Sequence, residues 1–368
     1  MEEKNSISKL RMGVLGLGEG RSVISAVQSS DWWELGAVCD LNEQLCQERA
    51  REFNLPGYTL DYAEMLADPT IDVIGIYTPD PLHARHIIMA LEAGKHVVCT
   101  KPLMVSLTDA KALLDAQRAA GRRVMVGQSS RYFEVAMRQR ADYEAGKNGA
   151  LVTVETSYIS DSRWFLERPW SHQEGFSWLY NFLIHAVDLA LWYLPRVEEV
   201  VGFGVTSANS AEKGIDAPDA LKFLFRDASG VTASVTGAYA TPALAPPVEH
   251  FITCVLRGTM GASRADCPFD YGYHFSEPGK FKRTEQENYE SKRAYYYRFE
   301  GDTHHAGEYQ NYLEYFARCL AEGTEPKPDL REGIRTIAVM ETMSRSLRTR
   351  QVERVSDTLQ EWGLQELC

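Results

Sequence analysis

The chain has 368 residues, 44% of them hydrophobic and 24% charged, and its formal net charge at pH 7 is -12. These proportions are typical of a globular enzyme with two domains, each large enough to have its own core. An acidic surface repels phosphate backbones, so we expect no nucleic-acid partner. Residues 1–12 lack the apolar core of a signal peptide, and no apolar run is long enough to span a bilayer. We therefore expect a cytoplasmic protein with no membrane partner.

Cysteine usage agrees with that location. The chain has seven cysteines, an odd number, and no two of them form a CxxC pair. Reduced thiols, several of them buried as small apolar side chains, are the simplest interpretation. These residues are Cys39, Cys46, Cys99, Cys254, Cys267, Cys319 and Cys368.

Short apolar runs alternate with amphipathic stretches along residues 1–128. The runs predict strands at 10–16, 35–40, 71–78, 95–100 and 123–127. The stretches between them predict helices at 20–30, 42–53, 81–93 and 106–119. Near-continuous apolar strands separated by helices predict a parallel sheet covered on both faces. Residues 1–128 are thus predicted to form an α/β domain of the doubly wound, Rossmann type.

The pattern changes after residue 128. A helix predicted at 132–146 leads into alternating segments that follow one another without helices, at 151–160, 197–207, 220–225, 231–239 and 251–257. Such segments are typical of antiparallel strands. Further helices are predicted at 177–194, 304–322 and 330–348. Residues 129–368 are thus predicted to form an α+β domain on a mostly antiparallel, open sheet. Segments such as 231–239 would leave a flat apolar face, so we expect a homodimer or homotetramer through this sheet.

A glycine-rich turn directly follows the first predicted strand. Glycines at this place permit a tight turn and let backbone N–H groups approach a pyrophosphate at a helix N-terminus. The match to GxGxxG is imperfect, because an arginine stands where the third glycine belongs, and that arginine could contact a phosphate. The candidate cofactor-binding residues of the turn are Gly16, Gly18, Glu19, Gly20 and Arg21.

Asp40 ends the second predicted strand, 22 residues beyond Gly18. An acid there can accept hydrogen bonds from both adenosine-ribose hydroxyls and would repel a 2′-phosphate, which favours NAD over NADP. The alternative is an ordinary turn or helix-cap aspartate before Asn42.

Two strand-end motifs identify a family. Tyr-Thr-Pro-Asp-Pro-Leu-His at 77–83 ends the third predicted strand, and Thr-Lys-Pro at 100–102 ends the fourth. With the glycine turn, the predicted second domain and the segment 175–188, they resemble the glucose–fructose oxidoreductase, inositol dehydrogenase and rhizopine-catabolism family (Gfo/Idh/MocA). The resemblance covers nearly the whole chain. It implies that Thr78, Pro79, His83 and Thr100 lie near the nicotinamide cofactor.

Lys101 is the first catalytic candidate. In the family this motif usually reads Glu-Lys-Pro, and its lysine lies between nicotinamide and substrate; here Thr100 replaces the glutamate. A lysine at the carboxyl end of a parallel strand stands where such sheets bind ligands. Its ammonium could bond the substrate oxygen and oppose developing negative charge. The alternative is an exposed lysine before a proline turn.

A second catalytic cluster is expected on the helix at 177–194. The family pattern resembles Asp-x-x-x-His-x-x-Asp, and the matching residues here are Asn181, His185 and Asp188. Spacings of three and four place them on one helical face. Neutral His185 could accept the hydroxyl proton, and Asp188 could hold the ring. Asn181 could orient a hydroxyl or the imidazole, but it supplies no charge.

Aromatic residues are dense between residues 164 and 192. Trp164, Trp170, Trp178 and Trp192 fall there, and such a wall suits the apolar face of a sugar or cyclitol. The aromatics could equally fill a core or a subunit contact. We take Trp164 and Trp170 as candidate substrate contacts.

Gln128 and Arg131 follow the last strand predicted in the first domain. We expect Gln128 to contact cofactor or substrate and Arg131 to contact substrate. His304 and His305 stand at a predicted helix start, where capping is the default role and a substrate contact is the alternative. His83 and His86 are three residues apart with no further ligands near them in sequence, so we expect no metal site.

Three functions follow from these observations. The first is an NAD-dependent oxidoreductase acting on a sugar, cyclitol or sugar derivative. The second is an enzyme that retains its NAD and uses transient oxidation for elimination, epimerisation or glycoside cleavage. The third is a non-catalytic sensor of dinucleotide and sugar, which Asn181 and Thr100 favour and Lys101 and His185 oppose.

Overall fold

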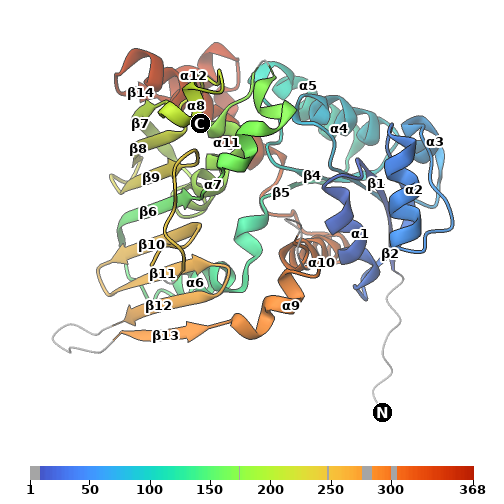
Figure 1. Cartoon of the computed structure of the whole chain (residues 1–368), viewed down its shortest axis with the longest axis horizontal. Helices are drawn as coiled ribbons and strands as arrows, with labels where there is room; N and C mark the ends of the chain where they lie inside the picture. Colours follow the sequence, from blue (N-terminus) through green and yellow to red (C-terminus); the bar gives the residue numbers. More distant parts are fainter. Residues whose placement is uncertain (1–8, 174, 247, 276–283, 300–304) are drawn as a thin grey trace. The chain divides into compact units, whose positions relative to one another are not determined.

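The computed structural model describes residues 9–173, 175–246, 248–275, 284–299 and 305–368, which form two compact units (Figure 1). Unit 1 contains the chain up to Ser129 together with Arg293–Ile334. Unit 2 contains Ser130–Lys292 and Arg335–Cys368. The segment Arg293–Ile334, which lies in the second of the two predicted domains, thus groups with unit 1.

Unit 1 is built on a five-stranded parallel sheet of order β2-β1-β3-β4-β5, which confirms the Rossmann-type fold. Its strands are β1 (Leu10–Leu15), β2 (Trp33–Cys39), β3 (Val73–Ile76), β4 (His96–Thr100) and β5 (Val124–Gly127). Its helices are α1 (Gly20–Gln28), α2 (Glu43–Glu52), α3 (Tyr62–Ala67), α4 (His83–Glu92), α5 (Ala110–Ala120), α9 (Arg293–Tyr296) and α10 (Gly307–Glu322). Within this unit, Figure 1 shows α4 and α5 on one side of the sheet and α1 and α10 on the other.

The burial of the strands explains the layered arrangement. Every residue of β3 and β5 is buried, as expected for strands covered on both faces. Helix α10 completes one layer by packing on α1. It also supplies the Leu313 carbonyl oxygen that accepts a hydrogen bond from the buried Trp33 indole, 3.0 Å away. The late segment therefore belongs to the core of unit 1.

Unit 2 is built on a nine-stranded sheet of order β13-β12-β11-β10-β6-β9-β8-β7-β14, which is antiparallel except for the parallel pair β6–β9. Its strands are β6 (Leu151–Ile159), β7 (Val197–Val205), β8 (Ala220–Asp227), β9 (Thr232–Ala238), β10 (Ile252–Gly258), β11 (Gly261–Cys267), β12 (Asp270–Phe275), β13 (Glu285–Asn288) and β14 (Glu353–Arg354). Its helices include α6 (Glu134–Glu144), α7 (Ile184–Tyr193), α8 (Ala208–Ala211) and α12 (Val355–Glu361). Helix α11 (Leu330–Thr349) begins in unit 1 and continues in unit 2.

Strands β8 and β9 of this sheet alternate between buried and outward-facing side chains. Helix α7 packs on β6, β9 and β10, and the side chains of β8 alternate between buried and exposed. On β9 the outward side chains are Thr232, Ser234 and Thr236, while Ala233 and Val235 are buried. The flat apolar face expected over 231–239 is therefore wrong for this strand, because its apolar residues point into the core.

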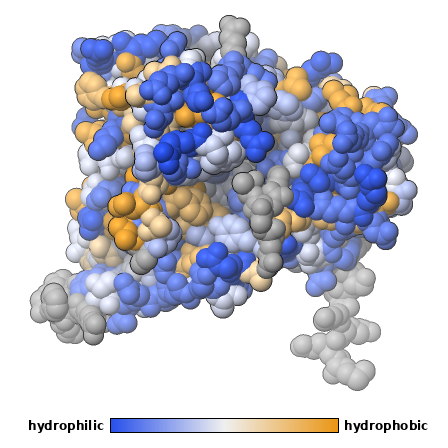
Figure 2. All heavy atoms as spheres, in the orientation of Figure 1, coloured by the Kyte–Doolittle hydropathy of each residue, from blue (hydrophilic) through white to orange (hydrophobic). Residues whose placement is uncertain are grey.

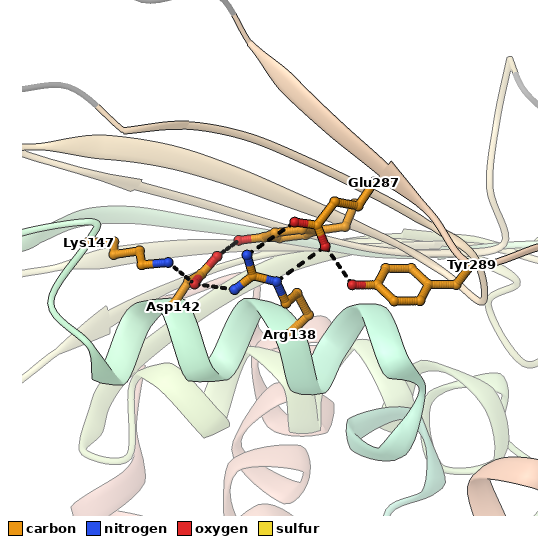
Figure 3. A network of polar contacts seen from close by, with 6 residues as sticks. Arg138, Asp142, Lys147, Glu287 and Tyr289 are labelled. Atoms are coloured by element: carbon orange, nitrogen blue, oxygen red, sulfur yellow. Dashed lines mark hydrogen bonds and ion pairs between the residues drawn. The ribbon is translucent and has the colours of Figure 1, made fainter.

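A network of polar side chains joins α6 to β13, the edge strand of the same sheet (Figure 3). The guanidinium of Arg138 lies between the carboxylates of Asp142 and Glu287, with 3.1 and 3.2 Å bonds to Glu287. Lys147 donates to Asp142 at 2.6 Å, and the Tyr289 hydroxyl donates to Glu287 at 2.6 Å. Because these charges compensate one another, we assign the network a structural role.

The surface is largely hydrophilic where Figure 2 shows α2 and α3, and the cysteines are free thiols, as the composition predicts. The visible surface over α2 and α3 is mostly hydrophilic, with isolated hydrophobic residues (Figure 2). All seven cysteines are free; six are buried, and Cys368 is exposed. Among the helices that the structure describes, none combines the length and the apolarity that a membrane span needs.

Candidate functional site

The glycine turn connects β1 to α1 at the carboxyl edge of the unit 1 sheet. Gly16 has φ +86°, and a Cβ atom there would lie 2.5 Å from the carbonyl oxygen of Tyr77, so only glycine fits. A Cβ on Gly18 would meet nothing within 4 Å, which leaves open space in front of the turn. Gly20 begins α1, and its Cβ would approach the Val14 side chain to 3.0 Å. The turn thus has the shape and the space that a pyrophosphate requires.

Asp40, directly after β2, faces this turn. Its carboxylate accepts hydrogen bonds from the backbone N–H of Leu17 at 2.8 Å and of Asn42 at 2.9 Å. The aspartate therefore does begin a turn, as the alternative interpretation holds. A carboxylate has about four acceptor positions, so two bonds leave capacity for ribose hydroxyls. The two roles are compatible.

Arg21 is engaged within the unit. Its guanidinium pairs with Glu52 at 2.6–2.7 Å and lies 4.3 Å from the centre of the Phe299 ring. Glu52 also pairs with Arg49. The ion pair with Glu52 compensates the charge that could have attracted a 2′-phosphate.

The motif after β3 is held by two histidines of α4. Both histidines contact Thr78. Its carbonyl oxygen is 2.7 Å from Nε2 of His83, and its hydroxyl is 3.0 Å from Nδ1 of His86. His83 is fully buried, and its Nδ1 is 2.7 Å from the carbonyl oxygen of Pro102. Both ring nitrogens of His83 are thus bonded to backbone. His83 therefore links these two stretches of backbone, and its expected place near the cofactor stays a prediction. Pro79 is exposed and Thr78 is partly buried.

Lys101 follows β4 at the same edge of the sheet. Burial lowers the pKa of its ammonium below the ordinary value, and the carboxylates of Asp80 and Glu19 oppose that change. Asp80 comes from the loop after β3, and Glu19 comes from the glycine turn. Lys101 thus stands among side chains from three strand ends, as expected for a ligand-binding edge.

Gln128 directly follows β5, the last strand of the unit 1 sheet. It is buried, and its Oε1 has no hydrogen-bond partner among the described residues. A buried acceptor without a partner is costly, so a donor from a bound molecule would stabilise it. Thr100, the last residue of β4, is partly buried and carries no charge.

Helix α10 contributes residues to unit 1 that the sequence analysis did not place there. The Tyr309 hydroxyl donates to Glu19, whose carboxylate is thereby tied to α10. His305 contacts the buried carboxylate of Glu308 through Nδ1. Burial alone would lower the pKa of His305, but Glu308 raises it above the ordinary value. His304 lies outside the described residues.

The second candidate cluster lies in unit 2. His185, near the start of α7, is partly buried, and its Nδ1 is 2.7 Å from the hydroxyl of Ser130. The ring also meets the edge of Tyr158, with 5.6 Å between ring centres. Ser130 was not foreseen, because nothing in the local sequence links residues that are 55 positions apart.

Asp188 and Arg131 form a buried pair in the same unit. The guanidinium donates two bonds, at 2.6 and 2.7 Å, to the two carboxylate oxygens, and the exposed fractions are 4% for Arg131 and 0% for Asp188. The Arg131 guanidinium also lies 5.3 Å from the centre of the Trp192 ring. Arg131 and Asp188 are thus bonded to each other, and the contact expected between Arg131 and substrate stays a prediction.

Asn181 lies in a π-helical turn, Leu179–Leu183, that precedes α7. Its side-chain oxygen accepts a bond from the backbone N–H of Ser177 at 3.3 Å, and the residue is 8% exposed. π-Helical turns occur often at functional sites, and the role expected of Asn181 in orienting a hydroxyl or the imidazole stays a prediction.

The aromatic residues divide between core and surface. Trp178 is fully buried and stacks on Tyr239, with 5.3 Å between ring centres, so it belongs to the core. Trp164 is 50% exposed, and Trp170 is partly buried against Phe165. Both expected contacts are thus accessible from solvent, whereas Trp178 is not.

Two other features, groups of metal-binding side chains and a cavity at the opposite edge of the unit 1 sheet, add nothing to the candidate site described above. Over the described ranges, no three His, Cys, Asp or Glu side chains are grouped as metal ligands. A cavity of about 500 Å³ lies at the amino ends of the unit 1 strands, next to residues such as Trp32, Lys95 and His96. None of the residues of the nucleotide motifs lines it.

Both units of the chain resemble known proteins. Residues 10–128 match the oxidoreductase family with an NAD-binding Rossmann fold, and residues 137–263 match the GFO/IDH/MocA C-terminal domain. The chain is 26% identical over 289 residues to levoglucosan dehydrogenase of Pseudarthrobacter phenanthrenivorans, across 70% of this chain and 73% of that protein. It is also 26% identical over 264 residues to scyllo-inositol 2-dehydrogenase (NAD+) of Bacillus subtilis, across 71% and 74%. A structure of levoglucosan dehydrogenase in complex with NADH and levoglucosan has a TM-score of 0.78 at 23% identity, over 95% of this chain and 100% of that one.

Proposed function

Because the chain belongs to the Gfo/Idh/MocA oxidoreductase family, we propose that it is an NAD-dependent dehydrogenase acting on a carbinol group of a sugar, cyclitol or related alcohol. The observation that carries the proposal is Lys101, an ammonium of lowered pKa among side chains from three strand ends of an NAD-binding unit. The named relatives, which act on levoglucosan and scyllo-inositol, support the substrate class.

The residues of unit 1 fit NAD. The glycine turn would hold the pyrophosphate, Asp40 the adenosine ribose, and the unpartnered Oε1 of Gln128 would accept a hydrogen bond from the ligand. When bound, NAD supplies the acceptor for a hydride from the carbinol carbon. Asp40 and the pairing of Arg21 with Glu52 favour NAD over NADP.

Lys101, His185 and Ser130 take the remaining tasks. The ammonium of Lys101 bonds the substrate oxygen and lowers the cost of its developing negative charge. His185 accepts the hydroxyl proton, and the hydroxyl of Ser130 orients the imidazole through Nδ1. Removing either group should cost a factor of about 100 or more in turnover.

The test is a screen of levoglucosan, scyllo-inositol, D-xylose and related alcohols with NAD, followed by NADH absorbance. Lys101→Met and His185→Gln should lose turnover while NADH affinity stays within a few-fold of the parent. Lys111→Met, at an exposed position on α5, is the matched control. If both active-site variants keep full activity, the assigned roles are wrong. Product formed without NADH would instead favour the enzyme that retains its NAD, and NADH binding with no turnover of any alcohol would favour the sensor.

A further inference from the structure

The bonding of His83 determines the hydrogens on its ring. His83 is the first residue of α4 and is 0% exposed. Its Nδ1 is 2.7 Å from the Pro102 oxygen, and its Nε2 is 2.7 Å from the Thr78 oxygen. A carbonyl oxygen can only accept a hydrogen bond, so each nitrogen must donate. A ring that donates from both nitrogens is an imidazolium, because the neutral ring has only one N–H.

The two carbonyl groups belong to different strand-end loops. Thr78 lies in the loop after β3, and Pro102 directly follows Lys101 after β4. His83 thus bonds to both loops, and its contact with the second loop is next to Lys101, directly after the end of β4. Its two bonds are charge-assisted, and such bonds are roughly twice as strong as neutral ones.

The neighbouring groups differ from His83 in their bonding. The other charged or titratable side chains around these loops include Glu19, Tyr62, Asp80, Arg85, His86, Cys99 and Lys101. Burial, together with His83 and Arg85, lowers the pKa of His86 to about 4, so His86 is neutral near pH 7. Its Nδ1 meets a hydroxyl, which can donate as well as accept. His86 therefore needs no positive charge and offers a matched comparison on the same helix.

We propose that His83 is a positioning residue: as a buried imidazolium it joins the loop after β3 to the Lys101–Pro102 turn and thereby sets the position of the Lys101 ammonium. The catalytic consequence rests on the proposed function, whereas the ring's two N–H groups and the position of the lysine do not. Glutamine can donate to only one of the two carbonyl groups, because the other end of its amide is an acceptor.

Nitrogen NMR of histidine-labelled protein tests the charge directly. At about pH 7.5, where an exposed histidine is mostly neutral, one ring should show both nitrogens protonated. That signal should disappear in His83→Gln and persist in His86→Gln. A His83 ring with one unprotonated nitrogen would overturn the proposal.

Chemical labelling tests the position of Lys101 without any substrate. Acetylation of the whole protein by acetic anhydride, read by mass spectrometry, compares Lys101 with the exposed Lys111 in the same sample. His83→Gln should make Lys101 react several times faster relative to Lys111, and His86→Gln should not. Unchanged labelling of Lys101 in folded His83→Gln protein would refute the positioning role.

Kinetics adds the functional consequence with any alcohol found by the screen. A displaced catalytic group costs about 100-fold in turnover, so kcat of His83→Gln should fall by that factor while the NADH Kd stays within a few-fold. An unchanged kcat would overturn the proposal. If the parent turns over no alcohol, the proposed function fails while NMR and labelling still decide the role of His83.

Discussion

Breaking the Arg131–Asp188 pair by removing only one partner should destabilise unit 2 severely. Two bonds of 2.6 and 2.7 Å join groups that are 4% and 0% exposed, so neither charge has access to bulk solvent. Arg131→Met would leave a buried carboxylate without its guanidinium, and Asp188→Leu would leave a buried guanidinium without its carboxylate. Either loss costs about 3–5 kcal/mol. That is a large part of the roughly 5–15 kcal/mol by which a domain is stable.

The double variant distinguishes the cost of an unpaired charge from the value of the pair. Replacing both partners of a buried pair by apolar residues is often neutral, so Arg131→Met with Asp188→Leu should recover most of the loss. Free energies of unfolding would come from urea titrations followed by circular dichroism. Arg163→Met breaks the exposed Arg163–Asp161 pair and should change stability little. A single variant that costs under about 1 kcal/mol, or a double variant as unstable as the worse single one, would refute the reasoning.

Three further predictions concern unit 1. Asp40→Asn should weaken NADH binding about tenfold and reduce the difference between the dissociation constants for NADH and NADPH, as measured by fluorescence titration. A parent protein that binds NADPH more tightly than NADH would contradict the role of Asp40. Gly16→Ala should lower the thermal midpoint and abolish NADH binding, because its Cβ would lie 2.5 Å from a carbonyl oxygen, whereas Gly18→Ala should leave the midpoint nearly unchanged. Glu308 raises the pKa of His305, so their pair stabilises the fold below the ordinary histidine value of about 6.5 and loses that contribution as pH rises through the raised value. Glu308→Gln should therefore lower the thermal midpoint more at about pH 6 than at about pH 9, and equal losses would argue against the ion pair.

The architecture of unit 1 could be predicted because each strand is an apolar run bounded by turn residues. The same periodicity did not find α3, whose six residues are too few to show a helical repeat. In unit 2 it did not find β11, β12 or β13, where small and polar residues such as those of Glu285–Asn288 dilute the alternation. Local pattern is weak wherever a strand owes its place to its neighbours in the sheet.

In the candidate site, the positions of the motif residues could be predicted, but their bonding partners could not. Motif positions such as Gly16, Asp40 and Lys101 could be predicted, because strand ends and spacing are local properties of the sequence. Partners could not: Ser130 bonds a histidine 55 positions away, and Arg131 bonds an aspartate 57 positions away. Which polar side chain satisfies which buried group depends on tertiary packing, which spacing alone does not encode.

The division of unit 1 between two stretches of chain has a consequence for its biosynthesis. Residues up to Ser129 leave the ribosome long before Arg293–Ile334, which supplies α10 and the carbonyl partner of the Trp33 indole. Until some 300 residues have been translated, the face of α1 that packs on α10 remains uncovered on the nascent chain. The nucleotide-binding unit, although it comes first in the sequence, is therefore completed only after strands β6 to β13 of unit 2 have emerged. A shortened gene that stops after residue 128 would encode a sheet whose α1 layer lacks α10, and its product should be recovered as aggregate.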